Sequence, residues 1–253
     1  MILFSIFSSC FEINLEIAND KNENIIVSIA SSLSIPFQEL IQNYESEFSQ
    51  SKIILNSGAS NTLFYQIKYG APVSILISAD QNIIKKLTQI NIKIDSNSWK
   101  ELVKNELVLI TPTTREIQIN SLNDLKSENI KRIAYGNPNL APVGSYTKEI
   151  LIANDIWTLV ESKGIPTQTA KQCLDYVSRG EVDAGFVFLT DALSVINDVK
   201  IKLNLPTVSS IIYTGILIPQ KNVINEKAKH FFSYMQSLIS QEIFRKYGFQ
   251  IIY

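Results

Sequence analysis

Short apolar runs alternate with amphipathic segments along almost the whole chain of 253 residues, and this alternation limits the possible folds more than any other feature. The apolar runs have the length of single strands, and helix-start signals follow several of them within a few residues. Strands that alternate with helices in this way are typical of α/β proteins. The sequence therefore predicts an α/β fold.

Two consecutive cycles near the N-terminus show the pattern. Residues Ile25 to Ala30 indicate a buried strand, and Pro36 stands near the start of a helix whose apolar residues are three and four positions apart. Residues 52–61 predict a strand and a Gly/Ser turn, and the next helix ends at Gly70. Further strands are predicted over residues 74–80, 106–112, 184–188 and 210–219.

The C-terminal segment, residues 225–249, predicts a helix with one apolar face. This face carries Ala228, Phe231, Phe232, Met235, Leu238, Ile239 and Ile243. Such a stripe is typical of core packing. His230, the single histidine, lies beside the stripe, and we expect it to be exposed to solvent rather than to act as a metal ligand or base.

Charge and cysteine content narrow the class of partner. Lys and Arg number 23 and Asp and Glu 24, and they are scattered, so no basic surface for nucleic acid is indicated. The two cysteines, Cys10 and Cys173, are far apart, which predicts neither a disulfide framework nor a metal cluster. We expect Cys173 to pack as a small buried apolar residue.

The N-terminal residues 1–23 indicate a leader or signal segment. They begin with an apolar stretch too short to span a bilayer and turn polar before the first strand, which predicts an exported protein. The positively charged start of a usual signal is missing. The residues FSSC, ending at Cys10, resemble a lipoprotein cleavage box, so a lipid anchor at Cys10 is an alternative to an ordinary signal segment.

Four turns, at residues 30–34, 58–62, 141–145 and 167–171, each lead into the start of a predicted helix. A helix N-terminus offers unpaired N–H groups and a partial positive potential, so several of them meeting at one cleft hold an anion without a buried Lys or Arg. Ser32 and Ser60 add hydroxyl donors. Each serine, taken alone, is also explained as an N-cap.

None of these turns contains Asp or Glu, and this bears on the protonation state of the ligand. A protonated oxyanion such as hydrogen phosphate needs an acceptor for its proton, whereas a fully deprotonated dianion needs donors only. The turns therefore favour a dianion such as molybdate, tungstate or sulfate.

Several segments together carry a resemblance to a known family. They are IIVSIASSLSIPFQEL, SGASNTLFYQIKYGAP with the SILISAD that follows it, YGNPNLAPVGSYTKE, GEVDAGFVFLTDA and EIFRKYGF. In these segments the chain resembles the molybdate-binding proteins of bacterial ABC importers. The resemblance implies a two-lobed periplasmic-binding-protein fold with a ligand cleft between the lobes. It also implies an extracytoplasmic monomer that has no cofactor. This monomer would bind molybdate, and with it tungstate, and deliver it to a membrane permease.

The resemblance assigns five ligand-binding positions. Ser32 and Ser60 match hydroxyl ligands in the first lobe, and Val143 and Ala170 match main-chain N–H donors in the second. Phe188 stands where some members of the family have a tyrosine that contacts the anion. Because phenylalanine cannot donate a hydrogen bond, we expect this contact to be lost or supplied by water or by a neighbour such as Thr190.

We expect residues 24–109 and 206–253 to form the first lobe and residues 110–205 the second.

Two alternatives remain for function: a binder of sulfate or another tetrahedral oxyanion, and an enzyme built on the same fold. An enzyme is disfavoured because no Cys/His or Ser/His pair is available beyond the lone histidine, and no cation site is indicated. The carboxylates are interpreted as capping or lobe-stabilising groups: Asp80, Asp183 and Asp191.

Overall fold

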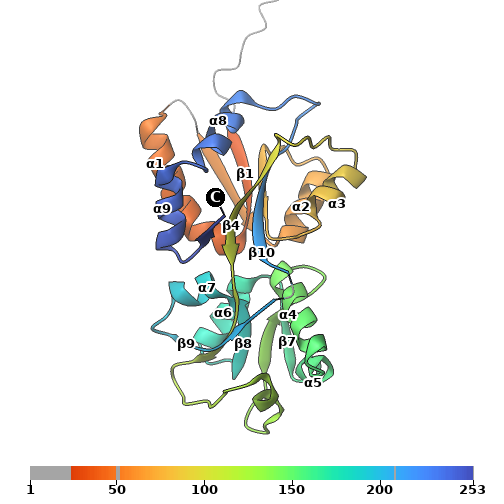
Figure 1. Ribbon diagram of the computed structural model, residues 1–253, viewed down its shortest axis with the longest axis vertical. Helices are drawn as coiled ribbons and strands as arrows, with labels where there is room; N and C mark the ends of the chain where they lie inside the picture. Colours follow the sequence, from red (N-terminus) through yellow and green to blue (C-terminus); the bar gives the residue numbers. More distant parts are fainter. Residues whose placement is uncertain (1–23, 50–51, 208, 253) are drawn as a thin grey trace, which may run out of the picture.

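The computed structural model describes residues 24–49, 52–207 and 209–252, and it confirms an α/β fold with two lobes, each built around one sheet (Figure 1). The predicted leader and Cys10 lie outside the described residues.

The first lobe has a six-stranded sheet in the order β11-β4-β10-β3-β1-β2. Its strands are β1 (Ile25–Ala30), β2 (Ile53–Gly58), β3 (Ile75–Ser78), β4 (Trp99–Asn105), β10 (Ile211–Leu217) and β11 (Gln250–Ile251). Strands β1, β2 and β3 are parallel, and β10 runs antiparallel between β3 and β4. Its helices are the 3-10 helix η1 (Ser31–Leu33), α1 (Ser34–Glu47), α2 (Ser60–Lys68), α3 (Ile83–Gln89), α8 (Glu226–Tyr234) and α9 (Leu238–Lys246).

The second lobe has a five-stranded sheet in the order β7-β6-β8-β5-β9. Its strands are β5 (Leu107–Pro112), β6 (Ile133–Gly136), β7 (Gly164–Thr167), β8 (Ala184–Phe188) and β9 (Val199–Leu205). Its helices are the 3-10 helix η2 (Leu122–Lys126), α4 (Pro142–Ala153), α5 (Trp157–Ser162), α6 (Ala170–Ser178) and α7 (Leu189–Ser194).

The chain passes between the sheets twice, from β4 to β5 and from β9 to β10. The first passage lies earlier than the expected boundary after residue 109, because Leu107, Val108 and Leu109 already pair with β8 and β9 in the second sheet. The second passage lies between Leu205 and Ile211. Strand β4 was not predicted from the sequence; several of its side chains are exposed or half-buried and it has no continuous apolar run.

The predicted C-terminal helix is two helices, α8 and α9. Ser237 separates them, because its side chain accepts the N–H of Ser240 and thereby caps α9. The prediction of a single apolar face was therefore wrong for Leu238 and Ile239, because their side chains are exposed. His230 is exposed as predicted, and its Nδ1 lies 2.8 Å from the hydroxyl of Tyr44.

The helices that follow β1, β2, β7 and β8 begin at or within a few residues of the strand end. In parallel strand-helix units the carboxyl ends of the strands meet at one edge of the sheet, which is where such folds bind ligands. The two sheets lie in separate lobes, and the chain segments that pass from one sheet to the other join them (Figure 1).

Candidate functional site

A small cavity of about 20 Å³ lies between the lobes, and all five predicted ligand-binding residues line it. The lining residues are Ala30, Ser31, Ser32, Gly58, Ala59, Ser60, Ala79, Ala141, Pro142, Val143, Thr169, Ala170 and Phe188. They come from strand ends and first helical turns of both lobes. Space of this size is enough for the centre of about one water molecule, so the cavity is narrow.

No charged side chain occurs among the described residues that line this cavity. Its polar groups are the hydroxyls of serine and threonine and main-chain N–H groups at helix starts. The first-turn N–H groups of a helix have no acceptor within the helix, and they carry the positive end of its dipole. The cavity is therefore rich in donors.

Ser60 is fully buried and is the first residue of α2. Its Oγ accepts a hydrogen bond from the main-chain N–H of Ala79, at 3.3 Å. Because that bond uses a lone pair of Ser60, the hydroxyl proton is left to donate elsewhere. The N-cap of α2 is Ala59, so Ser60 is not the N-cap of this helix.

Ser32 lies in η1, whose N-cap is Ala30, while the N-cap of α1 is Leu33. Ser32 is thus not an N-cap either. Its Oγ lies 2.7 Å from the hydroxyl of Tyr213, which is fully buried on β10. Tyr213 was not predicted from the sequence to belong to the site. Its signal is a tyrosine within an apolar strand, since a buried tyrosine hydroxyl usually has a hydrogen-bond partner.

The second lobe contributes helix starts. Val143 is the second residue of α4, after Pro142, and Ala170 is the first residue of α6. The side chain of Thr169 caps α6 by accepting the N–H of Gln172. The N–H of Ala170 has no acceptor inside the helix, because Ala170 is its first residue.

The first turn of α4 packs directly on strand β6. A side chain at Gly144 would collide with the main-chain oxygen of Gly136, so glycine permits this close approach. The approach places the N-terminus of α4 against the end of β6, beside the cavity.

Phe188 is almost fully buried, and its ring makes edge contacts with Tyr146 and Tyr213 at centroid distances of 6.5 and 6.1 Å. Thr190 does not line the small cavity. Its Oγ1 accepts a hydrogen bond from Asn105 at 2.8 Å, and its side chain lines a neighbouring cavity of about 370 Å³. The expectation that Thr190 supplies the contact missing at Phe188 is therefore not supported.

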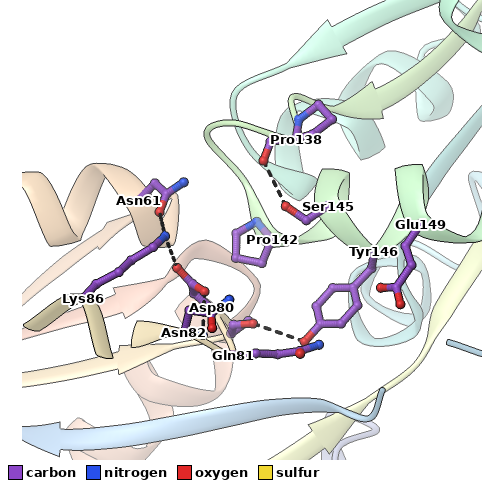
Figure 2. A pocket seen from close by; sticks show the side chains of 11 residues that line it. Asn61, Asp80, Gln81, Asn82, Lys86, Pro138, Pro142, Ser145, Tyr146 and Glu149 are labelled. Atoms are coloured by element: carbon purple, nitrogen blue, oxygen red, sulfur yellow. Dashed lines mark hydrogen bonds and ion pairs between the residues drawn. The ribbon is translucent and has the colours of Figure 1, made fainter. Parts of the chain in front are cut away.

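A polar hollow of about 280 Å³ lies beside the small cavity, and Figure 2 shows residues of the two lobes facing one another across it. Lys86 is held by first-lobe partners: its Nζ pairs with Asp80 at 2.5 Å and donates to Asn61 at 2.7 Å. Asp80 also accepts the N–H of Asn82, the N-cap residue of α3, which has no side-chain cap bond. Of the two roles predicted for Asp80, capping or lobe stabilisation, its bonds within the first lobe support the second. The charges of Lys86 and Asp80 therefore offset each other, while the carboxylate of Glu149 also lines the hollow.

The other two carboxylates predicted to be structural are buried in the second lobe. Asp183 pairs with Arg115 at 2.7 Å and accepts the N–H groups of Lys131 and Arg132, so it stabilises the lobe as predicted. Asp191, in the first turn of α7, accepts a bond from the main chain at Phe188.

Burial raises the pKa of Asp191 to about 7, and its Oδ2 has no hydrogen-bond partner in the described part of the chain.

Across residues 24–49, 52–207 and 209–252 no group of three or more His, Cys, Asp or Glu side chains is placed to hold a metal ion. None of the helices described there has the length and apolar character of a membrane span.

Two α/β lobes with an uncharged, donor-rich cavity between them are the architecture of a class of ligand-binding proteins. The chain belongs to a family with this architecture, the bacterial extracellular solute-binding proteins, whose model matches residues 25–250. The predicted two-lobed binding-protein fold is thereby confirmed.

Similar proteins support the resemblance noted in the sequence. A putative ABC transporter substrate-binding lipoprotein of Bacillus subtilis, YvgL, is 32% identical over 97% of this chain and 94% of its own length. The molybdate-binding protein ModA of Escherichia coli is 30% identical over 90% of this chain and 89% of its own length. The resemblance to molybdate-binding proteins is therefore confirmed.

Solved structures show the same fold. The substrate-binding domain of a putative molybdenum ABC transporter from Clostridium difficile has a TM-score of 0.69 and 30% identity, covering 91% of this chain and 99% of its own. The sulfate-binding protein SubI of Mycobacterium tuberculosis has a TM-score of 0.78 at 13% identity, covering 90% of this chain and 87% of its own. The second likeness shows the fold alone.

Proposed function

We propose that this extracellular solute-binding protein serves an ABC importer and binds molybdate, and with it tungstate, in the small cavity between its lobes. The observation that carries the proposal is the chemistry of that cavity, which offers hydroxyl and main-chain donors and no charged side chain among the described lining residues. The molybdate-binding relative and the molybdenum transporter domain support the choice of ligand.

The proposed binding mode has four donors. The hydroxyls of Ser32 and Ser60 donate from the first lobe, and the main-chain N–H groups of Val143 and Ala170 donate from the second. Hydrogen bonds to a charged acceptor are stronger than neutral ones, and helix N-termini add a favourable potential. A fully deprotonated tetrahedral dianion suits such a site, because it needs donors and offers no proton of its own.

Calorimetry and thermal unfolding of the purified protein with molybdate, tungstate, sulfate and phosphate test the proposal. A ligand that binds only the folded state stabilises it by about 2.7 kcal/mol at 100 times its Kd. We expect molybdate and tungstate to raise the melting temperature. A rise with sulfate or phosphate, and none with molybdate or tungstate, would replace this proposal with the alternative oxyanion binder.

The wider role follows from the same assignment. We propose a monomer that delivers its anion to a membrane permease, contains no cofactor and catalyses no reaction. A turnover assay with candidate substrates tests for an enzyme. Chemical conversion of any of these substrates by the purified protein would argue against a pure binder.

Export is proposed to depend on residues 1–23, so deleting them should abolish secretion. For Cys10 the lipoprotein relative from Bacillus subtilis supports a lipid anchor. The variant Cys10→Ser should then move the protein from the membrane fraction to the soluble extracellular fraction, whereas an ordinary signal segment predicts no change in fractionation.

A further inference from the structure

The hydroxyl of Tyr213 is buried between two polar side chains. Its Oη lies 2.7 Å from Oγ of Ser32 and 3.2 Å from Nδ2 of Asn105. Tyr213 is fully buried, and Asn105, the last residue of β4, is nearly so. The three side chains thus form a chain of hydrogen bonds that runs from the passage between the lobes to the small cavity.

The orientation of the Asn105 amide follows from its neighbours. Its Oδ1 accepts the main-chain N–H of Glu106 at 2.9 Å and faces the N–H of Thr190 at 3.5 Å. The amide nitrogen must then point the other way, where one hydrogen reaches Oγ1 of Thr190 and the other reaches Oη of Tyr213. Asn105 is therefore a donor to Tyr213.

This fixed orientation determines the direction of the whole chain. An amide NH₂ group cannot accept a hydrogen bond, so the single proton of Tyr213 is directed to its other neighbour, Oγ of Ser32. Ser32 then accepts at Oγ and has its own proton left for the cavity that it lines. Ser60 is in the same state, because it accepts from the N–H of Ala79.

We propose that Tyr213 and Asn105 are positioning residues that commit the Ser32 hydroxyl to donate into the cavity, and that they thereby select fully deprotonated oxyanions over protonated ones. This inference rests on the proposed function. A free serine hydroxyl rotates and accepts the proton of hydrogen phosphate, whereas a Ser32 that already accepts from Tyr213 has less capacity to do so. Removing the Tyr213 hydroxyl should therefore lower the preference for deprotonated over protonated oxyanions.

The test uses Tyr213→Phe, Ser32→Ala and the double variant, each titrated with molybdate and with inorganic phosphate. Loss of one buried hydrogen bond predicts that Tyr213→Phe weakens molybdate binding about tenfold. Phosphate binding should weaken less or improve, so the ratio of the two affinities falls by at least about threefold.

The double variant separates positioning from damage to the fold. Residues that act through one another are not additive, so in the Ser32→Ala background Tyr213→Phe should change molybdate affinity by less than about twofold. Tyr44→Phe is a matched control, since Tyr44 is also a buried first-lobe tyrosine and its hydroxyl meets His230, away from the cavity. It should lower the melting temperature without changing the affinity ratio.

Three outcomes would overturn the inference: an unchanged affinity ratio in Tyr213→Phe, an effect that adds fully to that of Ser32→Ala, or the same change of ratio in Tyr44→Phe. Failure of the proposed function is a different result, because the unaltered protein would then bind no molybdate or tungstate at all.

Discussion

The side-chain amide of Asn61 in the first lobe donates a hydrogen bond to the main-chain oxygen of Asn139 in the second lobe, at 2.7 Å. Lys86 donates to the oxygen of the same amide at 2.7 Å, which fixes the direction in which the amide nitrogen points. Asn61 lines the polar hollow between the lobes, and Asn139 lies in the turn before α4. This bond therefore links the two lobes directly.

Removing this bond should speed ligand release. We expect Asn61→Ala to weaken molybdate binding by about 1 kcal/mol, mainly through a faster dissociation rate, because the bond exists only when the lobes meet. Stopped-flow displacement measures that rate. Asn56→Ala is the control, since the side chain of Asn56 bonds to Ser28 and Gln66 within the first lobe. Equal dissociation rates in the two variants would show that the bond does not hold the lobes together.

The two cavity serines should each contribute to affinity. We expect Ser32→Ala and Ser60→Ala to weaken molybdate binding by roughly 1–3 kcal/mol each, because each loses a donor to a desolvated charge. Calorimetry gives both values. Ser46→Ala, on the exposed surface of α1, should bind as the unaltered protein does. Unchanged affinity in both cavity variants would remove these serines from the site.

A hydroxyl added at Phe188 should strengthen binding, since Phe188 lines the cavity and lacks a donor. We expect Phe188→Tyr to bind molybdate about 1 kcal/mol more tightly, with an unchanged melting temperature in the absence of ligand. Phe186→Tyr is the control on the same strand: Phe186 is fully buried and does not line the cavity, so its new hydroxyl should only destabilise the protein. A destabilised Phe188→Tyr with unaltered affinity would place Phe188 in the core alone.

The raised pKa of Asp191 predicts a pH dependence of stability. Burial raises this pKa from 3.8 to about 7, so the folded protein binds more protons than the unfolded chain between those values. The free energy of unfolding should therefore fall as the pH rises through this window. We expect Asp191→Asn to be more stable than the unaltered protein at pH 8, by about 2–4 kcal/mol, and to lose most of that advantage at pH 5. Denaturant unfolding at both pH values measures the difference, and an advantage independent of pH would contradict the assignment.

Local patterns in the sequence were enough to predict the strand and helix starts that form the cavity. A turn such as residues 58–62 specifies a strand end, a small residue and a helix start within a few positions, so its backbone is determined locally. For that reason Ser32, Ser60, Val143 and Ala170 were all predicted to lie at such starts, and all line one cavity. The roles of these residues in binding remain predictions.

The resemblance to a family supplied what spacing alone could not, namely that starts from both lobes meet and that Phe188 lies with them. Predictions made from residue spacing alone were less accurate. The stripe over residues 225–249 suited one helix, yet the cap at Ser237 divides it, because a side-chain bond to a single N–H outweighs a periodic pattern.

The sequence by itself determined the α/β class, the helix starts and the uncharged character of the binding turns, because each depends on residues close together in the chain. Only the tertiary structure decided which groups complete the site. Tyr213 is 181 positions from Ser32, and Asn105 meets Tyr213 and Thr190 at the passage between the lobes. The partner of a buried hydroxyl depends on how segments distant in sequence pack against each other. The spacing of residues along the chain predicts local periodicity and does not predict such long-range contacts.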